Sequence, residues 1–156
     1  MLKSLGRLSR FMHYVACVAL LLVTFVTMSD ITLRAFKRPI VGSLEIVTFL
    51  GALLIAFSLP YTTEKGGHVY VDILVDKLKG RAKAVLVMAT RILGIVLFIF
   101  IGANFINYGF STLRSGEVSP SFRIPLYPLS FALAFAFFIE ALILVSQFYR
   151  LARGEG

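Results

Sequence analysis

Two charged side chains interrupt the long apolar runs of this sequence, Glu140 in the last run and Arg91 near the start of the run before it. A carboxylate deep in a membrane costs about 2.5 kcal/mol or more unless it is paired, protonated or hydrated. Arg91 follows Lys83 by eight residues and Glu140 precedes Arg150 by ten. In helices the two charges would then lie ~12 and ~15 Å in from the same side. The sequence therefore predicts an Arg91–Glu140 pair that fixes the register of the last two helices.

Two other roles stay open for Glu140. It could contact a partner protein, or it could carry protons or bind a cation during transport. A proton relay usually needs a chain of titratable groups, whereas this run contains a single carboxylate with an evident partner. Structural pairing is the preferred interpretation.

A second group of charges lies in the stretch SDITLRAFKRPIVGSLE, between the first two apolar runs. Asp30 and Arg34 are four residues apart, which places them on one face of a helix. Ser43 is positioned to cap the second helix, and Glu45 in its first turn complements the helix dipole. Arg34 and Glu45 should then meet across the corner. We expect Asp30, Arg34 and Glu45 to form structural ion pairs between the first two helices.

The same stretch carries Lys37 and Arg38 beside Pro39 and Gly42, which turn the chain. One interpretation is a salt-bridged hairpin tip with both bases in solvent. The alternative is a docking surface on which Lys37 and Arg38 attract an acidic partner.

No residue pattern points to an active site. The sequence has no Ser/His/Asp set, glycine-rich phosphate loop or CxxC motif. His13 and His68 are too few and too far apart for haem or metal, and the single Cys17 cannot form an intrachain disulfide. Asn104 and Asn107 suit hydrogen bonds between helices better than ligand binding. We therefore expect no enzymatic activity, cofactor or metal site.

The elements that must position these residues are membrane-spanning helices. The chain is 58% hydrophobic and only 15% charged, and its mean hydropathy is +0.88. These values are typical of an integral membrane protein. Each span needs roughly 20 apolar residues, and the sequence predicts a single all-α domain, 1–156, with four of them. The spans are expected at about 11–33, 44–63, 84–113 and 125–149. No signal-peptide cleavage site follows the first span, so it is interpreted as a retained helix rather than a signal peptide.

The distribution of Lys and Arg predicts the orientation. Ten lie in the N-terminal, middle and C-terminal segments, against five in the other two connections. Both termini should therefore face the cytoplasm, with residues 29–45 outward. The basic residues flank apolar runs, so the net charge of +8 indicates helix anchoring and not nucleic-acid binding. Within the middle segment, apolar residues at 71, 74, 75 and 78 predict a short amphipathic helix, about 70–79, flat on the membrane surface.

With these motifs in place, the chain resembles the small membrane subunit of the TRAP (tripartite ATP-independent periplasmic) transporter family over nearly its whole length. The resemblance rests on three segments of the sequence: the corner with Arg34, Phe36, Pro39, Gly42 and Glu45; Gly51 followed by the Gly-His-Val-x-Val-Asp signature with Gly67, His68 and Asp72; and SPSFRIPLYPLSFAL with Pro120, Pro125 and Pro128. Two features depart from the family. Tyr127 stands where Trp is common, and Pro60 falls within the second span, where it is expected to disturb the helix.

The resemblance implies a subunit of a secondary transporter in the bacterial inner membrane. A periplasmic binding protein would capture an organic acid, and a large multispanning subunit would hold the substrate and Na⁺ sites. This chain would pack against the large subunit as a scaffold, with Lys37 and Arg38 available to the binding protein. Two alternatives stay open: a small self-assembling four-helix exporter that uses Glu140, and a membrane anchor for another complex.

Overall fold

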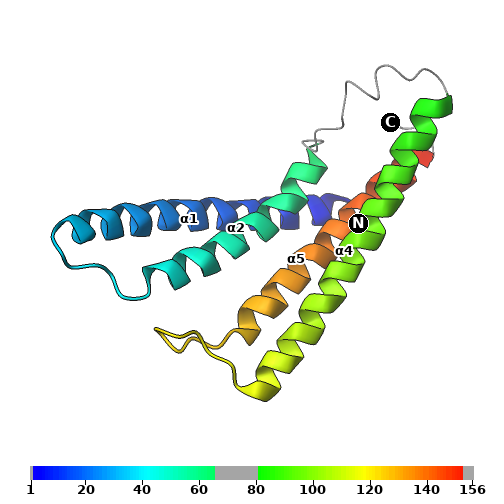
Figure 1. The fold of residues 1–156 in the computed structure, drawn as a ribbon. Helices are drawn as coiled ribbons and strands as arrows, with labels where there is room; N and C mark the ends of the chain where they lie inside the picture. The colour runs from blue at the N-terminus through cyan, green and yellow to red at the C-terminus, as the bar shows by residue number, and fades with distance from the viewer. Residues whose placement is uncertain (1, 66–80, 153–156) are drawn as a thin grey trace.

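The structure is a computed structural model of the chain that describes residues 2–65 and 81–152. Its helices run in the order α1 (Leu2–Ala35), α2 (Ser43–Glu64), α4 (Arg81–Ser115) and α5 (Tyr127–Ala152) (Figure 1). Among the described residues there is no β-strand, and the only bridge joins Val118 to Pro125 within the connection from α4 to α5.

All four described helices contain a segment long and apolar enough to cross a membrane. These segments are Leu5–Ala35, Ser43–Glu64, Met88–Ser115 and Tyr127–Tyr149. The prediction of an all-α protein with four membrane spans is confirmed. The amphipathic helix predicted at 70–79 lies outside the described residues. The cytoplasmic placement of the termini stays a prediction.

The helices form two antiparallel hairpins, α1 with α2 and α4 with α5 (Figure 1). The main contact between the hairpins is made by α2 and α5, whereas α1 touches α5 at only a few positions. A small apolar cluster fills this junction, and its buried members are Met12, Ala56, Leu133, Ala136, Ile139 and Ile143. Because small residues let helix backbones approach closely, the alanines allow α2 and α5 to pack side by side.

Helix α1 begins well before the apolar run that was expected to define it. Leu5 and Leu8 pack against the central cluster, and Ser9 is completely buried. The polar first turns are therefore stabilised as helix by contacts with the rest of the bundle, which the apolar run alone does not reveal.

Glycines on one face of α4 receive large side chains of α5. The three pairs are Gly94 with Leu144, Gly102 with Phe138 and Gly109 with Phe131. A Cβ atom added at Gly109 would lie 3.0 Å from the ring of Phe131. These contacts set the antiparallel register of the hairpin and leave the opposite face of α4 exposed. In the membrane-spanning stretch of α5, 50% of the residues are buried inside the protein, against 6% in the corresponding stretch of α4. Helix α5 is therefore the central helix.

The two ends of α2 differ from what the sequence predicts. Gly42, and not Ser43, is the N-cap residue; its φ of 78° is left-handed, and no side chain caps the helix. Ser43 instead forms the first helical residue and is buried. At the other end the helix runs through Pro60 to Glu64. Pro60 is buried against the bundle, and this packing offsets the loss of one backbone hydrogen bond.

Candidate functional site

Glu140 is completely buried near the middle of α5. The hydroxyl of Thr63, close to the end of α2, donates a hydrogen bond to Oε1 of Glu140. Further along α5, Nε2 of Gln147 donates to the backbone oxygen of Thr63 over 2.6 Å. Two side chains of α5 thus hold one residue of α2, and these polar contacts join the two hairpins.

The predicted partner of Glu140 was Arg91 on α4. The glycine contacts show which residues of α4 and α5 lie at the same height in the hairpin. In this register Glu140 lies about eight residues, or ~12 Å along the helix axis, from the level of Arg91. The Nε atom of Arg91 is buried. The contact that the structure gives for Oε1 of Glu140 is with Thr63, and the Arg91–Glu140 pair stays a prediction.

A second polar contact lies beside Thr63, at the end of α2, and joins α2 to α1. The buried hydroxyl of Ser9 on α1 donates a hydrogen bond to Oε2 of Glu64, the last residue of α2. Gly6 gives this carboxylate room, since a Cβ there would lie 2.6 Å from Oε1 of Glu64. Nearby, the rings of His13 and Tyr61 stack with centroids 4.3 Å apart. His13 therefore serves packing between α1 and α2.

At the opposite end of the first hairpin, Asp30 organises the α1–α2 corner (residues 36–42). Its Oδ2 accepts a hydrogen bond of 2.7 Å from Nε of Arg34, which forms an ion pair along α1. Its Oδ1 accepts one of 2.9 Å from the backbone N–H of Ile40. The expected Asp30–Arg34 pair is present, and Asp30 additionally holds the backbone of the corner.

Glu45 does not take the role expected for it beside Arg34. Its Oε2 accepts a hydrogen bond of 2.7 Å from the hydroxyl of Ser119 and one of 3.3 Å from the N–H of Phe122. Its Oε1 accepts one of 2.7 Å from the N–H of Ser121. All three donors lie in the α4–α5 connection (residues 116–126). The carboxylate therefore links α2 to the second hairpin, because that connection offers three donors to a group at the start of α2.

Packing beside Glu45 strengthens the same link. The ring of Phe122 lies against Gly42, where a Cβ atom would overlap the ring. Gly42 thus meets two demands, a left-handed φ and close approach of an aromatic ring. This gives the glycine of the corner motif a physical role.

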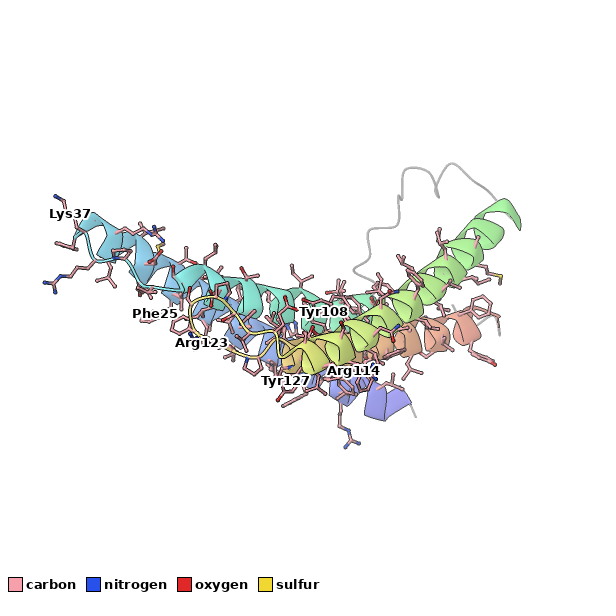
Figure 2. All side chains as sticks on the ribbon, turned by 60° about the horizontal axis from the view of Figure 1, so that its bottom comes forward. Phe25, Lys37, Tyr108, Arg114, Arg123 and Tyr127 are labelled. Atoms are coloured by element: carbon pink, nitrogen blue, oxygen red, sulfur yellow. The ribbon has the colours of Figure 1, made fainter. Side chains whose placement is uncertain are left out.

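Lys37 and Arg38 lie at the tip of the α1–α2 corner, and both are exposed. Figure 2 shows Lys37 at the extreme end of this hairpin and Arg123 in the other connection. Lys37 and Arg123 both have left-handed backbone angles, with φ of 57° and 52°. Contact between Lys37 or Arg38 and a binding protein stays a prediction.

The other residues of the expected family motif are placed as follows. Phe36 and Pro39 are exposed in the corner, Pro120 and Pro125 lie in the α4–α5 connection, and Pro128 is in the first turn of α5, while Gly67, His68 and Asp72 lie outside the described residues. A Cβ on Gly51 would meet nothing within 4 Å, and no contact with the described residues explains this glycine.

Asn104 and Asn107, expected between helices, are both exposed on α4. They face away from α5, since the glycines that contact α5 occupy the other side of α4. They therefore form no link between the four helices that the structure describes.

Within residues 2–65 and 81–152, no three His, Cys, Asp or Glu side chains come together as a group that could hold a metal ion. Most of the polar side chains described above serve contacts between segments of the chain itself. Three residues in these contacts, Thr63, Ser119 and Ser121, carry no sequence signal that would have singled them out; Ser121 takes part through its backbone N–H. The two serines lie in the proline-marked segment, but their spacing from Glu45 follows no local period.

This arrangement defines a class: a helical multi-pass membrane protein whose polar groups join its own hairpins. The particular family follows from comparison with known sequences. The family model described as the DctQ component of tripartite ATP-independent periplasmic transporters matches residues 23–154. The chain belongs to this family. It is a multi-pass protein of the inner membrane and a component of such a transporter. No curated protein matches the chain.

Proposed function

We propose that this chain is the small permease subunit that scaffolds the large transport subunit of a TRAP transporter. The large subunit would carry out Na⁺-coupled uptake of an organic acid delivered by a periplasmic binding protein. One observation supports the scaffold role above others: the completely buried side chain of Glu140 is hydrogen-bonded to another helix through Thr63. A group held in this way suits assembly better than transport.

The two hairpins are also linked at both ends. Glu45 binds the α4–α5 connection at one end, and Thr63 with Glu140 and Gln147 joins α2 to α5 towards the other. Such cross-linking suits a subunit that holds still while its partner moves between inward and outward states.

Docking of the binding protein is the second part of the proposal. Lys37 and Arg38 are exposed at the tip of a corner whose backbone is held by Asp30. A fixed pair of cations would raise the rate of encounter with an acidic partner. The orientation proposed from the Lys and Arg distribution, with both termini in the cytoplasm, places this corner in the periplasm.

The exporter alternative is less well supported. An exporter that used Glu140 would need the carboxylate to be reached by its cargo, whereas its exposed fraction is 0%. A membrane anchor for another complex would share the scaffold architecture, and co-purification separates it from the proposed subunit.

The proposal is tested by tagging the C-terminus, solubilising native membranes in mild detergent and identifying what co-purifies. A large TRAP membrane subunit at about one to one is expected. Recovery of the chain alone, or only with copies of itself, would overturn the scaffold role. For docking, uptake by the complex is measured at low binding-protein concentration with Lys37→Glu/Arg38→Glu. The control is the charge-conserving Lys37→Arg/Arg38→Lys, and equal uptake by both would refute docking at this corner.

A further inference from the structure

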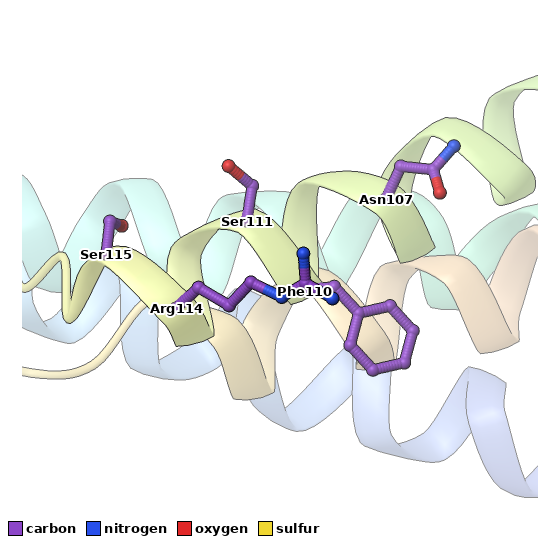
Figure 3. Close-up of a pocket in the computed structure, with 5 residues that line it drawn as sticks. All are labelled: Asn107, Phe110, Ser111, Arg114 and Ser115. Atoms are coloured by element: carbon purple, nitrogen blue, oxygen red, sulfur yellow. The ribbon is translucent and has the colours of Figure 1, made fainter.

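One face of α4 carries polar side chains that nothing in the described chain covers. Asn104, Asn107 and Ser111 are exposed and follow one another at intervals of three and four residues. This spacing places them in one stripe along a helix. Figure 3 shows Asn107, Ser111 and Ser115 directed to the same side of α4. We call Asn104, Asn107 and Ser111 the amide stripe.

The stripe lies within the membrane-spanning part of α4. The span runs from Met88 to Ser115, so Asn104 is ~16 Å from its nearer end and Asn107 is ~12 Å from it. A hydrocarbon core of about 30 Å, centred on this span, would include Asn104 and its apolar neighbours. An amide at this depth faces either lipid or another protein helix.

Lipid would leave these amides poorly satisfied. Exposed threonines elsewhere satisfy their hydroxyl donors within their own helix. Thr24 donates to the Leu20 oxygen over 2.9 Å, and Thr48 donates to the Leu44 oxygen over 2.7 Å. A primary amide has two N–H donors and a carbonyl acceptor. Asn104 uses one donor on the Phe100 oxygen at 2.8 Å, and its remaining groups have no partner among the described residues.

The amide of Asn107 is also left unsatisfied within the described chain. Among the described residues its side chain makes no hydrogen bond. Because hydrocarbon offers neither donors nor acceptors, amide groups left open at this depth are costly. A second helix with its own polar groups would satisfy them, and amides form such bonds between membrane helices.

The shape of α4 fits a helix as the occupant. Two hollows lie on this part of the helix, and each is lined by α4 alone. One, of about 410 Å³, is lined by Phe100, Ile101, Asn104, Phe105 and Tyr108. The other, of about 550 Å³, is lined by Asn107, Phe110, Ser111, Arg114 and Ser115. A hollow with walls from a single helix is open at the side, so the described chain leaves room there for another helix.

We propose that the amide stripe is the surface on which a membrane-spanning helix of the large subunit packs, and that this helix presents hydrogen-bonding side chains to Asn104 and Asn107. This inference rests on the proposed scaffold function. Ser111 suits the same contact, since a small residue lets two backbones approach closely.

Site-specific cross-linking tests the assignment. The chain is co-expressed with its large subunit, which carries a second tag, and a photoreactive phenylalanine derivative replaces Asn107 or Ser111. Matched controls carry the same group at Thr24 on α1 and at Thr48 on α2, both exposed. We expect several-fold more adduct with the large subunit from the two α4 positions than from either control.

Each outcome separates this inference from the proposed function. If the unsubstituted chain does not co-purify with the large subunit, the scaffold function fails and the inference fails with it. If it does co-purify but the adduct forms from Thr24 or Thr48 and not from α4, the function stands and the amide stripe is the wrong surface. Adducts of the α4 positions only with lipid, or only with a second copy of this chain, would also overturn the inference.

Loss of the amides gives a second measurement. With Asn104→Leu/Asn107→Leu, the affinity for the large subunit in detergent should be about threefold to twentyfold weaker, the range for interhelical hydrogen bonds. Thr24→Val/Thr48→Val is the control, because those hydroxyls bond within their own helices. Unchanged affinity of the leucine variant would contradict the proposal. Unfolding of the isolated variant, measured in parallel, tells loss of binding from loss of fold.

Discussion

Glu45 and Ser119, 74 residues apart in the sequence, are joined by a hydrogen bond of 2.7 Å. The same carboxylate accepts the N–H of Ser121 at 2.7 Å. One side chain in the first turn of α2 thus fixes the α4–α5 connection. Hydrogen bonds to an ionised carboxylate are stronger than neutral ones, so this residue joins the two hairpins at the end where both connections lie.

Replacement of Glu45 should release the α4–α5 connection. Gln keeps the size of the side chain but presents an N–H group where one carboxylate oxygen now accepts. In Glu45→Gln, the backbone amides of Ser121 and Phe122 should exchange hydrogen about tenfold faster. Glu117→Gln is the control, because Glu117 is an exposed acid in the same connection. Equal exchange in the two variants would contradict this role for Glu45.

Substitution of Gly42 should cost more than the strain of its backbone angle. Gly42 and Gly116 both have left-handed φ, 78° and 66°, but only Gly42 has a ring against it. The angle alone costs about 1–2 kcal/mol for alanine. Gly42→Ala should therefore lower the free energy of unfolding in detergent by more than Gly116→Ala does.

The excess should depend on Phe122. In a Phe122→Ala background the difference between the two glycine substitutions should shrink, because the clash is removed. An excess that persisted without the ring would show that another contact constrains Gly42.

Removal of the Thr63 hydroxyl should weaken the junction of α2 and α5. Thr63→Val keeps the shape but leaves the buried Glu140 without this donor. The expected loss in unfolding free energy is about 1–3 kcal/mol. Thr62→Val should cost less than about 0.5 kcal/mol, since the hydroxyl of Thr62 donates to the Ser58 oxygen in its own helix. Chemical denaturation in detergent compares the two, and equal losses would mean that the contact with Glu140 adds no stability.

A larger residue at Gly102 should separate α4 from α5. A Cβ there would lie 3.2 Å from the ring of Phe138, so Gly102→Leu should destabilise the isolated chain by about 1–3 kcal/mol through overpacking. Gly51→Leu is the control, because the chain offers it open space. Thermal unfolding of the purified chain measures both variants. A similar drop in melting temperature for the two would argue against close packing at Gly102.

Local features of the fold were predictable from the sequence. Four apolar runs gave four spans, because a helix that crosses hydrocarbon must be long and apolar whatever packs beside it. The Asp30–Arg34 pair was predictable for a similar reason, since residues four apart on one helix are neighbours in any fold. The polar turns at the start of α1 were missed, because contacts with α2 and α5 stabilise them as helix.

Long-range features were not predictable. Glu45 was expected to meet Arg34, its neighbour in sequence, and meets Ser119 instead. The contact of Thr63 with Glu140 was not predictable, because nothing in the local sequence distinguishes this threonine from others near the end of an apolar run. The exposed position of Asn104 and Asn107 was missed as well, since an amide in a helix gives no sign of which neighbour it faces.

The sequence by itself determined the membrane class, the number of spans and the family. Hydropathy and local spacing act within one helix, and they survive any arrangement of the helices. The tertiary structure alone decided which side chains meet: Glu45 with Ser119, Glu140 with Thr63, and the glycines of α4 with the rings of α5. The physical reason is that lipid and a packed core are equally apolar. Only the arrangement of the four described helices distinguishes the face of α4 that meets α5 from the face that carries the amide stripe.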